Sequence, residues 1–310
     1  MKLTVLAGGV GAARFLDGLV QVVPREEIVV IGNVGDDFEH LGLHVSPDLD
    51  TILYTLAELV HEGQGWGRRD ETASALDTVR RLGGPDWFFL GDRDIGLHLV
   101  RTERLRRGAP LSSITRDFAE RLGIGVRLLP ATDDPVRTRL RTHDGWLDFQ
   151  TYFVRRRHSD EVLEIEYQGV FEAVAAPGVV KAIDSADAVI FAPSNPYLSI
   201  DPITMIGDVG KALGRRSGPT LAISPIVGGR ALKGPADALM RSFVSEASAS
   251  KVVDHYVPYV SHVLIDTADA HEIPAIVDAF GVRVEAADIV MRDRAARARV
   301  AQRALSMLAA

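Results

Sequence analysis

The chain contains no cysteine, and aromatic residues make up only 6% of its 310 residues. The absence of cysteine excludes disulfide bonds, cysteine-ligated zinc and thiol catalysis, and it is typical of a reducing compartment. We therefore expect a cytoplasmic protein. Long hydrophobic runs are missing as well, and no window of the sequence is apolar enough to span a bilayer. The sequence therefore predicts no membrane partner.

Positive charge is in deficit. The chain has 35 lysine and arginine residues against 42 aspartate and glutamate residues, which gives a formal net charge of −7. This balance argues against a nucleic-acid surface as the main function. The hydrophobic content of 46% is ordinary for a globular protein. The length fits one large domain, or one domain with an insertion.

Several familiar motifs are incomplete or missing. The phosphate-binding pattern G-x-x-x-x-G-K-[ST] does not occur, and neither does the G-x-S-x-G turn of serine hydrolases. Gly9 and Gly11 fit the dinucleotide pattern G-x-G-x-x-G, but Arg14 stands at its third glycine. The acid that would hold a ribose after the second strand is replaced by Asn33. A nicotinamide-dependent dehydrogenase is therefore disfavoured.

The pattern at the N-terminus is that of an α/β protein. Leu3–Ala7 is a short apolar run, and it is followed by the glycine turn Gly8–Gly11 and by apolar residues at helical spacing. Ile28–Ile31 reads as a second buried strand. A strand, a helix and a second strand predict a Rossmann-like, mostly parallel sheet that is covered by helices on both faces.

The pattern of polar and apolar residues changes twice along the chain. Residues from about 48 to 122 show mostly helical periods, and we interpret them as a helical insertion. Residues from about 123 to 170 alternate in polarity and contain the hairpin signal THDGW, which predicts a small antiparallel β extension. The α/β core comprises residues 1–47 and 171–310. All three parts are expected to form a single domain.

Four apolar strands end in tight loops of small residues, namely GGVG, GNVGDD, PSNP and SPIVGG. Ligands of open parallel sheets bind outside the carboxyl ends of the strands, so we expect these loops to share one ligand site. Glycine amides at a helix N-terminus favour anions, and Arg14 and Lys233 can add positive charge. Each loop taken alone is also compatible with a plain turn.

Acidic residues follow the second strand and open the insertion. Asp36 and Asp37 are candidate Mg²⁺ ligands, although an isolated Gly-Asp-Asp is more often a solvated turn. In the stretch VSPDLDTILYTLAEL, Asp48 and Asp50 precede an apolar helix. Both favour a helix N-terminus through the dipole, and we assign the capping role to Asp48.

The motifs together resemble the 2-phospho-L-lactate transferases of deazaflavin coenzyme (coenzyme F-420) biosynthesis. The matching segments occur in family order from Lys2 to about Asp293. They are GGVGAARFLDGL, NVGDD, SPDLDTILYTL, WFFLGDRD, LLPATDDPV, APSNPYLSI and SPIVGGRALKGPA.

This resemblance implies a reaction. Such enzymes transfer a phospho-organic-acid unit, such as 2-phospholactate or phosphoenolpyruvate, from a guanosine diphosphate-linked donor to the deazaflavin Fo, and GMP leaves. Mg²⁺ is the implied cofactor, and a homodimer the implied assembly. The opening VLAGGVGAARFL and the WFFLGDRD segment look closer to the bacterial branch, in which the phosphoenolpyruvyl donor is common.

The resemblance also implies site residues. Asp50 and Arg93 match positions that contact the deazaflavin, and Asp50 is the candidate catalytic residue and a third candidate metal ligand. The implied nucleotide and phosphate contacts are Gly8, Gly9, Gly11, Ala12, Arg14, Asn33, Ser194, Asn195, Pro196, Ser224 and Lys233. We expect Asp50→Asn to leave the fold intact and to lower transfer or Fo affinity at least tenfold, roughly 1.4 kcal/mol.

One alternative belongs to a different functional class. The chain also shares its glycine-rich first turn with a family of nucleotide-sugar-binding regulatory proteins. The segments SPDLDT and LGDRD belong to the transferase pattern and therefore favour the enzyme. A regulator of this kind would bind nucleotide without releasing GMP in the presence of Fo.

Overall fold

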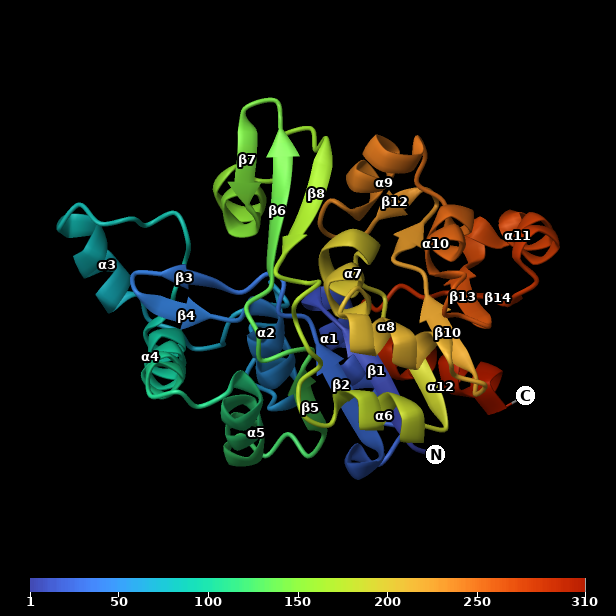
Figure 1. Ribbon diagram of the computed structural model, residues 1–310, viewed down its shortest axis with the longest axis horizontal. Helices are drawn as coiled ribbons and strands as arrows, with labels where there is room; N and C mark the ends of the chain where they lie inside the picture. The colour runs from blue at the N-terminus through green and yellow to red at the C-terminus, as the bar shows by residue number, and fades with distance from the viewer. Residues whose placement is uncertain (310) are drawn as a thin grey trace.

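A seven-stranded sheet forms the centre of the computed structural model, which describes residues 1–309 (Figure 1). Every neighbouring pair in this sheet is parallel. The strands, in sheet order, are β14 (Arg283–Ala287), β13 (His262–Asp266), β10 (Thr220–Ile223), β9 (Ala188–Phe191), β1 (Leu3–Ala7), β2 (Ile28–Gly32) and β5 (Arg127–Pro130). The predicted Rossmann-like α/β fold is confirmed.

Helices cover both faces of this sheet because successive strand residues point to opposite sides. In β1, for example, Val5 belongs to one hydrophobic cluster and Leu6 to the other. The first cluster is completed by α1 (Gly9–Leu19), α2 (Pro47–Leu56), α5 (Leu111–Arg121) and α12 (Arg294–Ala309). The second is completed by α6 (Val179–Ser185), α7 (Asp201–Thr204), α8 (Gly207–Gly214), α9 (Ala236–Val244), α10 (Ala249–Tyr256) and α11 (Ile273–Phe280).

The helical insertion divides into two parts. Helices α2 and α5 pack on the sheet, whereas α3 (Ser74–Arg81) and α4 (Asp92–Arg106) form an arm at the left of Figure 1. The hairpin of β3 (Phe38–His40) and β4 (Leu43–Val45) lies beside this arm, and β4 contacts α4. The sequence did not predict this hairpin, because its two strands of three residues are too short for an alternating pattern.

Each of the two helices of the arm is capped by an acid from outside that helix. The Asp92 carboxylate accepts hydrogen bonds from two amides in the first turn of α3, at 3.1 and 2.9 Å. Glu71 in turn accepts from the amides of Arg93 (2.9 Å) and Asp94 (3.1 Å), which begin α4. Each helix start therefore depends on a residue next to the other helix.

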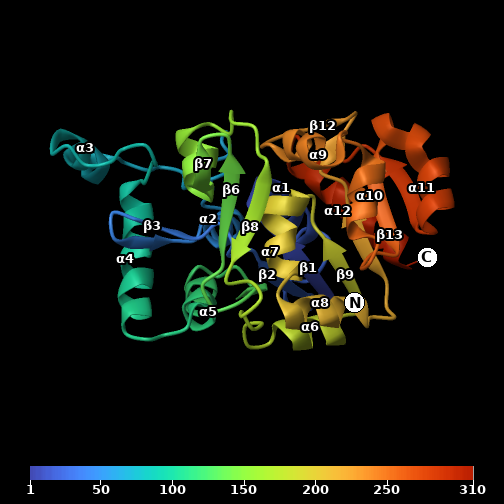
Figure 2. The same ribbon diagram turned by 45° about the horizontal axis from the view of Figure 1, so that its top comes forward.

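The predicted β extension begins too early. Residues 127–130 form β5, the edge strand of the parallel sheet, and not part of the extension. The antiparallel sheet itself comprises β6 (Arg137–Thr142), β7 (Gly145–Asp148) and β8 (Glu164–Gln168), and it stands above the main sheet in Figures 1 and 2. A further small hairpin, β11 (Ile226–Val227) with β12 (Arg230–Ala231), follows β10. Within residues 1–309, no helix is long and apolar enough to cross a membrane.

Candidate functional site

The strand order reverses direction between β1 and β9 at the middle of the sheet. From β1 the chain proceeds to β2 and β5 on one side, and then to β9, β10, β13 and β14 on the other. Such a switch point opens a crevice at the carboxyl ends of the strands. A cavity of about 640 Å³ lies there. Its lining includes residues of the glycine turn, the PSNP and SPIVGG loops, helix α2 and the aromatic segment Trp87–Phe89.

The glycine turn is packed too tightly for side chains. A Cβ added to Gly11 would lie 2.2 Å from the Pro193 carbonyl oxygen, and one on Gly8 would lie 2.6 Å from Asp48 Oδ2. The Ser194 hydroxyl donates to the Gly8 carbonyl at 2.9 Å, which joins the loops after β1 and β9. The two loops therefore form one continuous floor of the cavity.

We predict that Gly11→Ala lowers the free energy of unfolding by about 1–3 kcal/mol, the usual cost of overpacking, because the Pro193 backbone has to move. Gly214→Ala in α8 is the control, since a Cβ there meets nothing within 4 Å. We expect the control to be neutral or slightly stabilising, because alanine favours a helix. Urea unfolding of both variants measures the difference, and equal midpoints would contradict the prediction.

Asp48 is part of this floor, and it does not cap its own helix α2 as predicted. Its Oδ1 accepts the Gly9 amide at 2.8 Å, and its Oδ2 accepts the Asn33 amide at 2.9 Å. Asp48 therefore caps α1, the helix that follows the neighbouring strand. The pKa of this carboxyl is raised to about 6, chiefly by burial with a smaller contribution from the charge of Asp37, while the hydrogen bonds from Asn33 and Gly9 oppose the shift.

Asp50 also lines the cavity, but its carboxylate is already paired. Arg101 from α4 donates to both Asp50 oxygens, to Oδ2 at 3.0 Å, and His98 Nδ1 lies 3.7 Å from Oδ2. Asp50 and Arg101 are both buried, with Arg101 only 1% exposed. A ligand at Asp50 therefore shares the carboxylate with a fixed guanidinium. Sequence reasoning missed Arg101, which gives no signal of its own in the helical pattern of α4.

The two acids after β2 differ in their surroundings. Asp36 lines the cavity, and burial raises its pKa well above the usual range, with further contributions from the charges of Asp48 and Asp37. Asp37 lies behind the wall, where its Oδ2 accepts from the Ser46 hydroxyl (2.7 Å) and contacts His44 Nε2 (3.0 Å). The Oδ1 atoms of Asp36 and Asp37 are buried without hydrogen bonds. Over residues 1–309, no three acidic, histidine or cysteine side chains form a ready-made metal cluster.

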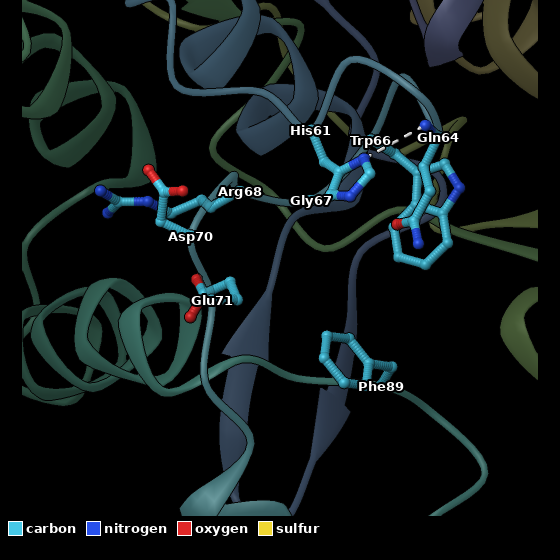
Figure 3. A pocket seen from close by; sticks show the side chains of 8 residues that line it. All are labelled: His61, Gln64, Trp66, Gly67, Arg68, Asp70, Glu71 and Phe89. Atoms are coloured by element: carbon cyan, nitrogen blue, oxygen red, sulfur yellow. Dashed lines mark hydrogen bonds between the residues drawn. The ribbon is translucent and has the colours of Figure 1, made fainter.

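Part of the cavity wall is aromatic. Trp87 and Phe88 line it and pack with Phe38 and His40, at ring distances of 4.8 Å for Phe38–Phe88 and 5.3 Å for His40–Trp87. Phe89 and Trp66, which also line the cavity, are about half exposed. Trp66, Gly67 and Phe89 also line a second hollow of about 300 Å³, shown in Figure 3. A planar ring could stack against this wall.

Two cations lie at the end of the cavity near the glycine turn. Arg14 and Lys233 both line it, and the Lys233 ammonium donates to the Gln64 carbonyl at 2.9 Å. Burial lowers the pKa of Lys233, and the charge of Arg14 lowers it further. Two cations close enough to affect each other in this way favour an anion between or beside them.

The structure brings most of the predicted nucleotide contacts to the cavity, as expected for loops at one edge. Those that line it are Gly8, Gly9, Gly11, Arg14, Ser194, Asn195, Ser224 and Lys233. Ala12, Asn33 and Pro196 are buried behind the lining. Arg93 is exposed on α4 and does not line the cavity, while its neighbour Asp94 does. The role of Arg93 at the deazaflavin stays a prediction.

The class that this fold and site define is a doubly wound α/β protein with its ligand cavity at the switch point of the sheet. Residues 3–302 match the family model described as 2-phospho-L-lactate transferase CofD. The chain belongs to this family. It is a transferase of a phospho-organic acid, and the predicted role in coenzyme F-420 biosynthesis is confirmed at that level.

Curated relatives cover nearly the whole chain. It is 43% identical to the phosphoenolpyruvate transferase of Kitasatospora aureofaciens, over 99% of this chain and 98% of the relative. It is 38% identical to that of Mycolicibacterium smegmatis, with the same coverage. A crystal structure of a Bacillus halodurans protein shares the fold, with a TM-score of 0.65 and 16% identity over 98% of this chain and 99% of that one.

Proposed function

We propose that the cavity binds a guanosine diphosphate-linked phospho-organic acid at the glycine turn and the deazaflavin Fo at the aromatic wall. In the transfer, a ribityl hydroxyl oxygen of Fo attacks the phosphorus that carries the organic acid. The bond from that phosphorus to the GMP oxygen breaks, GMP leaves, and the hydroxyl proton is lost. The product is a phosphodiester.

The observation that carries this proposal is that one cavity is lined by two chemically different groups of residues. Glycine amides, Arg14 and Lys233 suit phosphates, while Trp87 and Phe88 suit a planar ring. A transfer of this kind depends on positioning and charge neutralisation more than on covalent catalysis. The acids Asp48 and Asp50 lie on α2 and line the same cavity.

Asp48 is also a candidate for metal binding. Its carboxylate already accepts the Gly9 amide, so a phosphate arriving at the glycine turn meets a negative charge. A divalent cation between the two groups removes this repulsion. The charge of Asp48 raises the pKa of the Asp36 carboxyl, which places the two acids close together. Asp36 Oδ1 has no hydrogen-bond partner and is therefore a suitable ligand atom. Because Mg²⁺ usually takes one or two carboxylates plus phosphate oxygens, these two residues fit it.

When bound, Mg²⁺ would neutralise charge that develops on the transferred phosphate. We assign its protein ligands to Asp36 and Asp48, which both line the cavity, Asp48 beside the glycine turn. Asp37 lies behind the wall with Ser46 and His44, and Asp50 is paired with the Arg101 guanidinium, whose charge opposes a metal ion there. Asp50 instead presents a fixed, charged acceptor to the hydroxyls of Fo. Asn33 and Ser194 hold Asp48 and Gly8 in place at the cavity floor through their hydrogen bonds.

Phosphoenolpyruvate is the organic acid that we propose for the donor, supported by the names of the curated relatives at 38–43% identity. The chain is further proposed to act as a cytoplasmic homodimer, which light scattering of the purified protein can test. The same preparation serves for the activity assay below.

Purified protein with Fo, Mg²⁺ and either the phosphoenolpyruvyl or the phospholactyl donor tests the reaction. We expect GMP release and a product with the mass of the phosphoenolpyruvyl diester, and no turnover after removal of Mg²⁺ with a chelator. Nucleotide binding without GMP release would favour the regulatory alternative and overturn the enzyme. Faster turnover with the phospholactyl donor would overturn only the choice of organic acid.

A further inference from the structure

Helix α2 runs along the cavity and presents polar groups in sequence. Asp48 lies at the glycine turn, and Tyr54 follows six residues later, about 9 Å along the helix axis at 1.5 Å per residue. Tyr54 and Asp94, which comes from the first turn of α4, both line the cavity. The Arg68 guanidinium lies 5.5 Å from the Tyr54 ring, and Glu71 accepts the Asp94 amide. Arg68 and Glu71 line the second hollow together with Trp66 and Phe89, so the pair lies near these aromatic residues.

Tyr54 and Asp94 are buried without sufficient partners. Tyr54 is 2% exposed and Asp94 is 8% exposed. The Tyr54 hydroxyl and Asp94 Oδ1 have no partner at normal hydrogen-bond distance and angle. The two groups do interact, and this interaction lowers the pKa of Asp94 and raises that of Tyr54. Buried polar groups are normally satisfied, so an unpaired donor and acceptor that face one cavity call for an explanation.

The neighbouring acids differ from Asp94 in this respect. The Asp50 oxygens are held by Arg101, and Asp92 caps α3. The backbone of Asp94 is fixed, because Glu71, seen in Figure 3, accepts its amide hydrogen at 3.1 Å. The backbone that carries the Asp94 carboxylate is thus held in place, and Oδ1 of that carboxylate has no partner. Such rigid placement suits ligand recognition.

An anion does not fit directly at the Asp94 carboxylate. The charges of Asp50 and Glu71 already act on Asp94 and Arg68 opposes them, and a phosphate or carboxylate there would also be repelled by Asp94 itself. A neutral group that offers a hydrogen-bond donor next to an acceptor does fit. The phenol can donate to a carbonyl oxygen, while the carboxylate accepts from an N–H.

We infer that Tyr54 and Asp94 are specificity-determining residues that recognise the adjacent carbonyl and N–H groups of a cyclic imide on the acceptor ring. This inference rests on the proposed function, because the pyrimidinedione edge of Fo is the imide concerned. An acceptor ring that lacks a free imide N–H, or that carries a charge at this edge, binds poorly to the same pair.

Fo binding to the full-length protein, followed by ring fluorescence, tests the pair directly. We expect Tyr54→Phe and Asp94→Leu to weaken Fo binding at least tenfold, while affinity for the guanosine diphosphate-linked donor changes less than twofold. Asp94→Asn, which keeps one acceptor oxygen, should lose less. Fo methylated at the imide nitrogen should bind the unmodified protein at least tenfold more weakly than Fo, and Asp94→Leu should bind both ligands alike. Unchanged Fo affinity in Tyr54→Phe and Asp94→Leu would overturn the inference.

Stability measurements separate recognition from a structural role. The pKa of Asp94 is raised from 3.8 to about 6, chiefly by burial, with the charges of Asp50 and Glu71 contributing and Tyr54 and Arg68 opposing. Since the folded state holds this proton more tightly, the contribution of Asp94 to stability falls as pH rises from about 4 to 6. Asp94→Asn should therefore raise the melting temperature, and more at pH 7.5 than at pH 5. A lower melting temperature at both pH values would assign Asp94 a structural role and overturn the inference.

The outcome is distinguishable from failure of the proposed function. If the unmodified protein gives no product with Fo and either donor, the proposed reaction fails whatever the variants do. If it turns over normally, and Tyr54→Phe and Asp94→Leu keep the same KM for Fo, only the assignment of this pair fails. A raised KM for Fo with an unchanged KM for the donor supports the pair.

Discussion

Asp48→Asn is expected to lower kcat/KM for GMP release by roughly 10²- to 10³-fold, the scale of a lost electrostatic contact in a preorganised site. The carboxylate accepts from two donors, the Gly9 and Asn33 amides. An asparagine offers only one oxygen, so its NH₂ group must face one of these donors. The change also removes one of the two proposed metal ligands.

Asp208→Asn is the matched control for this variant. Asp208 is likewise the second residue of its helix, α8, but it is exposed. We expect its kcat/KM to stay within twofold of the unmodified protein. Raising the Mg²⁺ concentration should partly restore Asp48→Asn if the lost contact is to the metal. Activity of Asp48→Asn within tenfold of the unmodified protein would leave Asp48 only its role as the cap of α1.

Asp50→Asn is expected to lower the free energy of unfolding by about 3–5 kcal/mol, the usual cost of leaving a buried charge unpaired. Arg101 is 1% exposed, and its guanidinium donates to both Asp50 oxygens. Removing the Asp50 charge leaves this cation without its counterion. The sequence predicts an intact fold for this variant. The structure instead leads us to expect a destabilised one.

Two further variants test whether burial of the ion pair causes this loss of stability. Replacing both partners, as in Asp50→Leu with Arg101→Met, should recover most of the lost stability, because a well-packed apolar pair often substitutes for a buried ion pair. Asp184→Asn removes the same kind of forked pair, with Arg215, on the surface, and should cost no more than about 1 kcal/mol. Urea midpoints that agree for Asp50→Asn and Asp184→Asn would contradict the expected burial effect.

The sequence predicts the sheet well because its strands are continuous apolar runs. Leu3–Ala7 has the predicted bounds, and the second predicted strand, Ile28–Ile31, is extended by one residue in β2. β5 was assigned to the wrong unit, because an apolar strand after a long insertion gives no indication of which sheet it joins. β14 was not predicted, since RVEAA at the sheet edge is only partly buried and lacks such a run.

For the site, loop motifs indicate which segments meet, but not which atoms. GGVG, PSNP and SPIVGG do converge at one cavity. Sequence reasoning could not foresee that Asp48 reaches across to Gly9, or that Arg101 neutralises Asp50, because both contacts join residues about 40 or more positions apart. Tyr54 reads as one more residue of an apolar helix face until its hydroxyl is seen at the cavity wall.

The exchanged caps of the arm have a consequence for its folding. Asp92 completes the start of α3, and Glu71 completes the start of α4, so neither helix has its first turn satisfied while the other is unfolded. The segment from Glu71 to α4 should accordingly open and close as one cooperative unit, with similar hydrogen-exchange rates for its protected amides. Because Trp87–Phe89 and Asp94 lie in this unit, the aromatic wall and the polar pair beside it would assemble in a single event.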